Sequence, residues 1–322
     1  MADTHKVLVT GAGGPAGVAV IRSLLRREDL DVFAADMDGW ASGLYLVAAE
    51  RRRIIPAGRA PEFVDAVIDL VATDGIDVVV STVDAELPPL ARRRDELGAV
   101  LAAASGEALE TALDKWRLVQ ACAPHARVPH TELLTPGGIA HDWTFPVIVK
   151  PRSGAGSRGV HLVHTRAELE AAAPDETQII QENLPGEEFS VDVIVASDGH
   201  VVAAVPRLRA RVDSGVAVAG RTVHREELEA AAAACARAAG IVGVANVQLR
   251  YSIDGEPALL EINPRFSGAM PLTIASGVDM PSLAVDVALG REIPREVPFA
   301  EVANVRYLED VFLPVDEVLE TP

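Results

Sequence analysis

The chain has 322 residues, of which 49% are apolar and 24% charged, and its formal net charge at pH 7 is −18. This length is more than one hydrophobic core normally serves, so we expect a soluble globular protein of two or three domains. The acidity argues against nucleic acid or an anionic membrane as a partner, and no apolar run is long enough to span a bilayer.

Two further features concern the compartment in which the protein works. Residues 1–6 are polar and run directly into a strand pattern, so we expect no secretory signal. Cys122 and Cys235 lie in Ala-rich, helix-like stretches, where a buried thiol is expected rather than a disulfide or a metal ligand. Both features favour a cytoplasmic protein.

The first third of the chain alternates between strand and helix patterns. Apolar, β-rich segments predict strands, and apolar residues at helical spacing predict helices. The strands are expected at 6–10, 31–38, 51–58 and 77–82, and the helices at 17–27, 61–76 and 84–97. This alternation is typical of a parallel sheet that helices cover on both faces.

A glycine cluster follows the first of these strands. Gly11, Gly13 and Gly17 loosely fit a dinucleotide-binding fingerprint, with Asp36 at a suitable distance, but the third position of the strict motif is Ala16. The same glycines can serve a tight turn into a closely packed helix. They can also leave the first N–H groups of that helix open to an anion such as a substrate carboxylate. This segment alone leaves all three interpretations open.

From about residue 113 the pattern changes to short strands, hairpins and one glycine-rich loop. The sequence at 189–206 predicts two strands joined by a turn at Asp198-Gly199. A helix before Gly240 and a second hairpin at 243–265 follow. We therefore expect an α+β fold in this part of the chain.

Lys150 ends a predicted strand and is followed by the loop "SGAGSRG". A lysine fixed at a strand end supplies a point charge, and a glycine-rich loop supplies N–H donors, so together they suit a phosphate. The loop does not fit the P-loop pattern. The loop residues that we expect to contact phosphate are Ser153, Gly154, Gly156, Ser157 and Gly159.

A second polar group lies on the last predicted hairpin. Glu261 and Asn263 are two residues apart on a strand, so their side chains share a face, and Gln248 lies on the partner strand. Carboxylate and amide oxygens suit magnesium held together with nucleotide phosphates. Arg265 follows directly, in the order E-I-N-P-R.

Between these two groups, Pro185-Gly186 interrupts a strand pattern. Free backbone groups at such an interruption can read an adenine edge, and we expect them at Glu182, Asn183 and Leu184. The Glu182 carboxylate could accept from the adenine amino group. Glu187 or Glu188 could accept from the ribose hydroxyls.

The segments "FPVIVKP", "QENLPGEEFSVDV" and "NVQL…LEINPRFSG" resemble the ATP-grasp superfamily. The likeness is to one synthetase unit of the carbamoyl-phosphate synthase large chain and to stand-alone, single-unit ligases of that type. It covers nearly the whole chain. It implies an α/β and α+β fold with a Rossmann-like domain at 1–112, an ATP-grasp small subdomain at 113–185 and a C-terminal subdomain at 186–322.

The resemblance also implies an activity and a set of roles. The expected enzyme is an ADP-forming carboxylate–amine ligase that uses ATP and Mg²⁺, with Mn²⁺ as a substitute, and passes through an acyl phosphate. Lys115 and Lys150 would bind phosphates, Glu182 the adenine and Glu188 the ribose. Gln248, Glu261 and Asn263 would bind magnesium, and Arg265 would steady the transferring phosphoryl group.

An arginine-rich strand pattern at 205–223 stays outside this scheme. Arg207, Arg209 and Arg211 alternate, so they are expected on one face, and we take Arg209 and Arg211 as further candidate catalytic residues that bind the γ-phosphate or a substrate carboxylate. None of the eight histidines is expected to be catalytic, since phosphoryl transfer depends on positioning and charge neutralisation.

Several alternatives stay open at this stage. The chain carries one synthetase-like unit and no glutaminase-like segment, which favours an amide-forming ligase over carbamoyl-phosphate-type phosphorylation of carboxyphosphate or carbamate. An NAD(P)-dependent oxidoreductase and a non-catalytic nucleotide-binding protein are less favoured, because they leave the lysine, carboxylate and arginine set unexplained. The expected partners are a small-molecule acid and amine, and a homodimer is compatible with the sequence.

Overall fold

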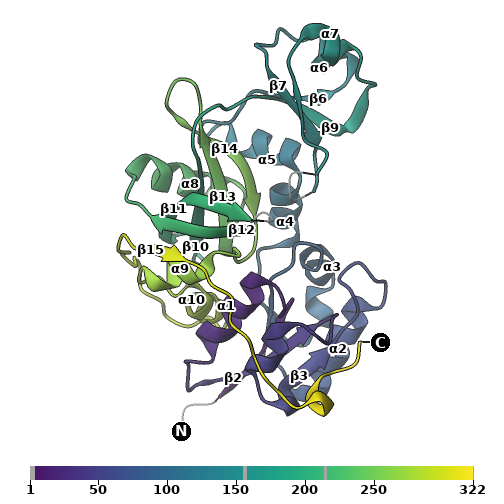
Figure 1. Ribbon diagram of the computed structural model, residues 1–322, viewed down its shortest axis with the longest axis vertical. Coiled ribbons are helices and arrows are strands. Elements are labelled where there is room, and N and C mark those ends of the chain that lie inside the picture. The colour runs from purple at the N-terminus through teal and green to yellow at the C-terminus, as the bar shows by residue number, and fades with distance from the viewer. Residues whose placement is uncertain (1–3, 155–157, 214–215, 322) are drawn as a thin grey trace.

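The computed structural model describes residues 4–154, 158–213 and 216–321. The molecule is elongated and contains one parallel and two antiparallel sheets (Figure 1). The parallel sheet occupies one end, the smaller antiparallel sheet occupies the other, and the larger antiparallel sheet lies between them. The predicted fold class is thereby confirmed.

The N-terminal sheet has five parallel strands in the order β3-β2-β1-β4-β5. Its strands are β1 (His5–Thr10), β2 (Leu30–Asp36), β3 (Arg52–Ile54), β4 (Val78–Ser81) and β5 (Val100–Leu101), and its helices are α1 (Pro15–Leu24), α2 (Phe63–Asp74), α3 (Leu87–Arg92) and α4 (Gly106–Leu113). The strand order reverses between β1 and β4, and ligands of open α/β sheets bind outside the carboxyl ends of strands at such a point.

One helix of this sheet is shorter than the sequence predicts. The pattern at 84–97 gives α3 over Leu87–Arg92 only, followed by a 3₁₀ turn at Arg94–Glu96. Pro88 and Pro89 lie in the first turn of α3, and proline is accommodated there because the first N–H groups of a helix have no internal partner. Residues 82–86 are left as the connection from β4.

The small sheet has the order β6-β9-β7-β8. Its strands are β6 (Thr131–Leu134), β7 (Val147–Pro151), β8 (His161–Val163) and β9 (Asp175–Glu182), and it carries α6 (Pro136–Ala140) and α7 (Arg166–Glu170). A separate core that includes Leu134, Trp143 and Ile180 holds it together. Helix α5 (Lys115–Cys122) precedes it and begins beside the end of β7, where Lys115 N donates to Arg152 O at 2.9 Å.

The large sheet has the order β14-β13-β10-β11-β12-β15. Its strands are β10 (Glu188–Val195), β11 (Val201–Asp213), β12 (Val216–Thr222), β13 (Gly243–Tyr251), β14 (Pro257–Asn263) and β15 (Ala303–Val305). Helix α8 (Glu226–Ala238) packs on it, and α9 (Met270–Ala275) and α10 (Met280–Ala288) follow β14. Both predicted hairpins form, and Gly199 and Gly255 take the positive φ that these turns require. The division into three domains at residues 112 and 185 stays a prediction.

A single apolar core joins the parallel sheet to the large sheet. Val9 of β1 and Val20 of α1 belong to the same cluster as Val205 of β11, and Met270 and Met280 of α9 and α10 complete it. Helix α1 therefore packs on α9 and α10, and its position relative to the large sheet is fixed.

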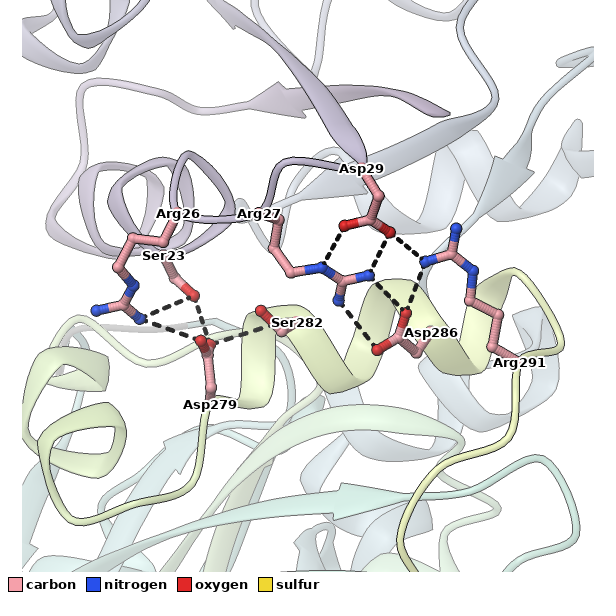
Figure 2. A network of polar contacts seen from close by, with 8 residues as sticks. All are labelled: Ser23, Arg26, Arg27, Asp29, Asp279, Ser282, Asp286 and Arg291. Carbon is pink, nitrogen blue, oxygen red and sulfur yellow. Dashed lines mark hydrogen bonds and ion pairs between the residues drawn. The ribbon is translucent and has the colours of Figure 1, made fainter. Parts of the chain in front are cut away.

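A network of ion pairs borders this core (Figure 2). Arg27, just after α1, binds Asp29 and Asp286 of α10 with two hydrogen bonds each, at 2.7–3.0 Å. Arg291 binds the same two carboxylates at 2.7 and 3.1 Å. The paired arginines hold the pKa of Asp29 below its ordinary value, with the Arg27 hydrogen bonds as the largest cause.

We expect Arg27→Ala to lower the free energy of unfolding at pH 7 by about 1–3 kcal/mol, because two partly buried carboxylates lose a bidentate partner. Because the pKa of Asp29 is lowered in the folded chain, its carboxylate stabilises the fold above about pH 4, and this stabilisation is lost as the pH falls further. The stability deficit of Arg27→Ala should therefore shrink on acidification. Urea unfolding at several pH values measures this. Arg22→Ala is the matched control on α1, since its pair with Glu309 is half exposed and should matter little. An equal loss in both variants would contradict the prediction.

After β15 the chain returns along α1 to the N-terminal sheet (Figure 1). Gly39 N donates to Thr321 Oγ1 at 2.9 Å, and Leu319 N donates to the Tyr45 hydroxyl at 3.0 Å. Within the described part of the chain, none of the helices has the length and apolarity that a membrane crossing needs.

Candidate active site

A cavity of about 1290 Å³ opens where the three sheets meet. Residues after the carboxyl ends of β1, β2 and β4 form one wall, and the small and large sheets form the others. The charged and amide side chains that line it include Asp36, Asp84, Lys115, Lys150, Arg158, Glu182, Glu188, Arg207, Arg209, Gln248, Glu261, Asn263 and Arg265. Most residues predicted for the site therefore share one cavity.

Lys150, on β7, is the most unusual charge in this cavity. Its side chain is buried, with 8% of the residue exposed, and no hydrogen bond or ion pair joins its ammonium to another residue within the described ranges. The pKa of Lys150 is lowered to about 8, chiefly by burial and also by the neighbouring charge of Lys115, while Glu261 partly offsets both effects. A buried, unpartnered ammonium that faces a cavity is suited to an anionic ligand.

Lys115 is held beside it at the start of α5. Asp114 caps this helix, accepting from Trp116 N at 3.0 Å, and also pairs with Arg152 after β7 at 2.6 Å. Lys115 Nζ donates to Gly154 O at 3.1 Å and lies 3.3 Å from Glu261 Oε2. Asp114 thus joins α5 to the end of β7, which brings the two lysines together.

The three predicted metal ligands lie side by side at the edge of the large sheet. Gln248 of β13 is the register partner of Glu261 of β14, and Asn263 is two residues further on, with its amide 3.4 Å from Glu261 Oε1. All three line the cavity. The donors are a carboxylate and two amide groups, which fit Mg²⁺, and Lys115 occupies the place of a counter-ion to Glu261.

Arg265 follows β14 and reaches the N-terminal wall. Its Nε lies 2.9 Å from Asp84 Oδ1, and its Nη1 donates to Phe266 O at 3.0 Å. Asp84 follows β4, so this ion pair joins the two sheets across the floor of the cavity. Arg265 lines the same cavity as the predicted magnesium ligands.

The residues predicted to bind the adenine and the ribose differ from the expectation in one respect. Glu182, Asn183 and Leu184 line the cavity, but the Glu182 carboxylate receives two hydrogen bonds from Arg127 Nη2, at 2.7 and 2.9 Å, and one from His130 N at 3.0 Å. The carboxylate is therefore fixed by the protein. Glu188 lines the cavity and forms an ion pair with Arg209.

The sequence predicts Arg207, Arg209 and Arg211 on one face of a strand, but on β11 they do not share a face. A bulge in the pairing with β12 lies between Arg209 and Arg211 and breaks the alternation. Arg207 and Arg209 line the cavity, whereas Arg211 is exposed and is not among the lining residues. The candidate role of Arg211 stays a prediction that this geometry does not support.

Arg207 is buried in a network around Asp192. Its guanidinium donates two hydrogen bonds of 2.9 Å to the fully buried Asp192 carboxylate. The same carboxylate accepts from Asn246, Ser267 and Thr273 at 2.6–3.1 Å. A positive charge is thus fixed at the cavity wall by a partner that the ligand cannot reach.

The glycine cluster forms part of the N-terminal wall. Gly14, Pro15 and Ala16 line the cavity at the start of α1. Pro15 has no N–H, so the first backbone N–H of this helix belongs to Ala16. Asp36 accepts from Gly13 N at 2.8 Å, which fixes the loop. Gly11 has φ +69°, and a Cβ there would meet Val83 at 2.4 Å, so the turn needs glycine.

The residues predicted in the glycine-rich loop after β7 are only partly found at the cavity. Gly156 and Ser157 lie outside the described residues. Ser153 and Gly159 are described but do not line the cavity, whereas Gly154 and Arg158 do. Sequence reasoning missed Asp84, Arg127 and Asp192. Asp84 alone had a local signal, its position after a strand of a parallel sheet.

Comparisons with known proteins agree with this arrangement. A model of the family described as "ATP-grasp in the biosynthetic pathway with Ter operon" matches residues 174–311. The carbamoyl phosphate synthase large chain of Thermotoga neapolitana is 28% identical over 262 residues, which are 73% of this chain and 23% of that protein. The chain thus spans about a quarter of the length of this relative.

Solved structures with the same fold include two informative cases. The biotin carboxylase domain dimer of Hydrogenobacter thermophilus 2-oxoglutarate carboxylase, in complex with MgADP and bicarbonate, has a TM-score of 0.74 and 17% identity, over 89% of this chain and 70% of that chain. The L-amino acid ligase of Bacillus licheniformis has a TM-score of 0.69 and 17% identity, over 89% and 75% of the two chains. At these identities the likeness shows the fold.

Proposed function

Since this chain is a member of the ATP-grasp superfamily, we propose that it is an ADP-forming ligase that joins a small carboxylic acid to an amine or a similar nucleophile. The observation that carries the proposal is the buried Lys150, which lines one cavity together with Lys115, Glu261 and Asn263. Two lysines and a set of hard oxygen ligands are what a magnesium nucleotide requires.

The cavity supplies a separate place for each reacting part. The interrupted strand at 182–184 receives the adenine, Glu188 the ribose, and the two lysines the phosphates. Gln248, Glu261 and Asn263 would hold Mg²⁺, which when bound neutralises charge on the phosphates. The start of α1, on the N-terminal wall, and Arg207, on the large sheet, also line the cavity, and there a substrate carboxylate would find a backbone N–H and a fixed positive charge.

The reaction proceeds in two displacements. A carboxylate oxygen of the acid attacks the γ-phosphorus of ATP, the bond to the β–γ bridging oxygen breaks, and ADP leaves. The amine then attacks the carbonyl carbon of the acyl phosphate, inorganic phosphate leaves, and the proton of the amine passes to it. Lys115, Lys150 and Arg265 stabilise the charge that moves during the first displacement, so no side-chain nucleophile is needed.

The test is ADP release by the full chain with Mg·ATP and a panel of acid–amine pairs, with L-amino acids first because a similar structure is an L-amino acid ligase. We expect ADP release that needs both partners. Release with bicarbonate and ammonia instead would favour carbamoyl-phosphate-type chemistry, as in the similar synthase. Reduction of NAD or NADP without any ADP release would contradict the proposal.

Gly14→Val tests the role of the α1 terminus in binding the acid. A Cβ at Gly14 meets only Gly11 O at 3.7 Å, so the fold should tolerate a side chain that projects into the acid subsite. We expect the KM for the acid to rise at least about tenfold, as one lost charge-assisted contact predicts, with Mg·ATP affinity unchanged. Gly106→Val, at the start of α4 where a Cβ meets nothing within 4 Å, is the control. An unchanged KM in Gly14→Val would exclude this subsite.

A further inference from the structure

Three metal-ligating side chains meet on the small sheet, outside the cavity. His130, Glu132 and His141 each place one ligand atom within 4.8 Å of the others. This is the only such group of three or more His, Cys, Asp or Glu side chains among residues 4–154, 158–213 and 216–321. None of the three lines the proposed ATP cavity.

The backbone holds all three residues in place. His130 directly precedes β6 and Glu132 lies in it, so both side chains project from the same face of an extended segment. His130 N donates to Glu182 Oε2 at 3.0 Å, and His130 O accepts from Glu182 N at 2.8 Å. His141 directly follows α6, and its carbonyl accepts from Arg166 Nη2 at 2.7 Å.

The side chains are also pre-arranged. The two imidazoles stack with centroids 4.3 Å apart, and both pack against the buried Trp143 at 4.9 and 5.2 Å. Glu132 Oε1 lies 3.8 Å from His130 Nε2. Donor atoms of a tetrahedral metal site are about 3.3 Å apart, as bonds of 2.0–2.2 Å require. The ligand atoms of this group lie within 4.8 Å of one another, so the exposed side chains must move closer for all three to bind one ion.

We propose that His130, Glu132 and His141 form a binding site for a divalent transition metal such as Zn²⁺. Two imidazoles and one carboxylate select Zn²⁺, Cu²⁺ or Ni²⁺ over Mg²⁺, which prefers oxygen ligands alone. The metal joins the end of α6 to the start of β6. It therefore stiffens the part of the small sheet whose backbone holds Glu182 at the cavity.

Calorimetric titration of the full chain with Zn²⁺, in excess Mg²⁺ to occupy the nucleotide site, tests the proposal. We expect one Zn²⁺ per chain, and an affinity at least about tenfold weaker in His130→Ala, His141→Ala and Glu132→Gln. His161→Ala, an exposed histidine on β8 of the same sheet, and Glu261→Gln should bind as the wild type does. A melting temperature that rises with Zn²⁺ in the wild type and not in His141→Ala gives a second readout.

Three results would overturn the proposal. They are no Zn²⁺ binding to the wild type, binding with wild-type affinity by both His130→Ala and His141→Ala, and binding lost in Glu261→Gln alone. The last would place the metal in the ATP cavity. Because the titration contains no nucleotide and measures no turnover, its outcome is independent of the proposed ligase activity.

Discussion

Replacing Lys150 with methionine is expected to remove ATP turnover and, at the same time, to stabilise the nucleotide-free protein at pH 7. Turnover should fall at least about 100-fold, since a charge that faces the transferring phosphate is lost. The stability gain follows from burial. The difference between a pKa of about 8 in the fold and the ordinary 10.5 corresponds to about 3 kcal/mol.

The pH dependence of this gain has a defined sign. The unfolded chain keeps the Lys150 proton up to about pH 10.5, whereas the folded chain loses it near pH 8, so wild-type stability rises with pH between these values. The advantage of Lys150→Met is therefore complete below pH 8 and disappears as the pH approaches 10.5.

Thermal unfolding at pH 7 and at about pH 10, together with ADP release, measures both effects. Lys6→Met is the control, because Lys6 lies on the N-terminal sheet, donates to Asp74 O at 2.7 Å and has no place in the cavity. Its turnover should equal that of the wild type. A less stable Lys150→Met protein at pH 7, or one that still releases ADP at the wild-type rate, would show that Lys150 is not a strained phosphate ligand.

Removing the Asp192 carboxylate is expected to cost about 3–5 kcal/mol of unfolding free energy. In Asp192→Ala, Arg207 keeps its charge in a site where 2% of the residue is exposed, and the Asn246, Ser267 and Thr273 side chains lose their acceptor. An unpaired buried charge is among the most destabilising changes available to a single substitution.

Urea unfolding of four variants, which are Asp192→Ala, Arg207→Ala, their double variant and one control, separates this effect from simple loss of volume. Asp69→Ala, at an exposed position of α2, is the control and should lie within about 0.5 kcal/mol of the wild type. The double variant Asp192→Ala/Arg207→Ala removes the orphaned charge and should lose less than the sum of the single changes. An Asp192→Ala variant within about 1 kcal/mol of the wild type would mean that the network stabilises little.

The sequence was most informative where the signal is local. The alternation of strand and helix patterns predicted the parallel sheet, and the Asp-Gly pairs predicted both hairpins, because each turn needs positive φ at its glycine. Lys150, Glu261 and Asn263 could be selected because charged and amide side chains are unusual at strand ends that should be buried. Their meeting in one cavity required the resemblance and then the structure.

What the sequence could not predict depends on pairing between distant segments. The bulge that turns Arg211 away is set by the register of β11 on β12, which alternation cannot reveal. The Asp192–Arg207 pair joins neighbouring strands, and the Arg127–Glu182 pair joins residues 55 positions apart. Nothing at Glu182 itself indicates that an arginine already holds its carboxylate.

The most direct test of the account is the thermal stability of the full chain with Mg·ATP, and separately with NAD and NADP. A ligand at about 100 times its Kd adds roughly 2.7 kcal/mol, which is a rise of several degrees in Tm. We expect such a rise with Mg·ATP, a smaller or absent rise in Glu261→Gln, and none with either nicotinamide cofactor. A rise with NAD or NADP and none with Mg·ATP would contradict it and assign the cavity to dinucleotide binding at the glycine cluster.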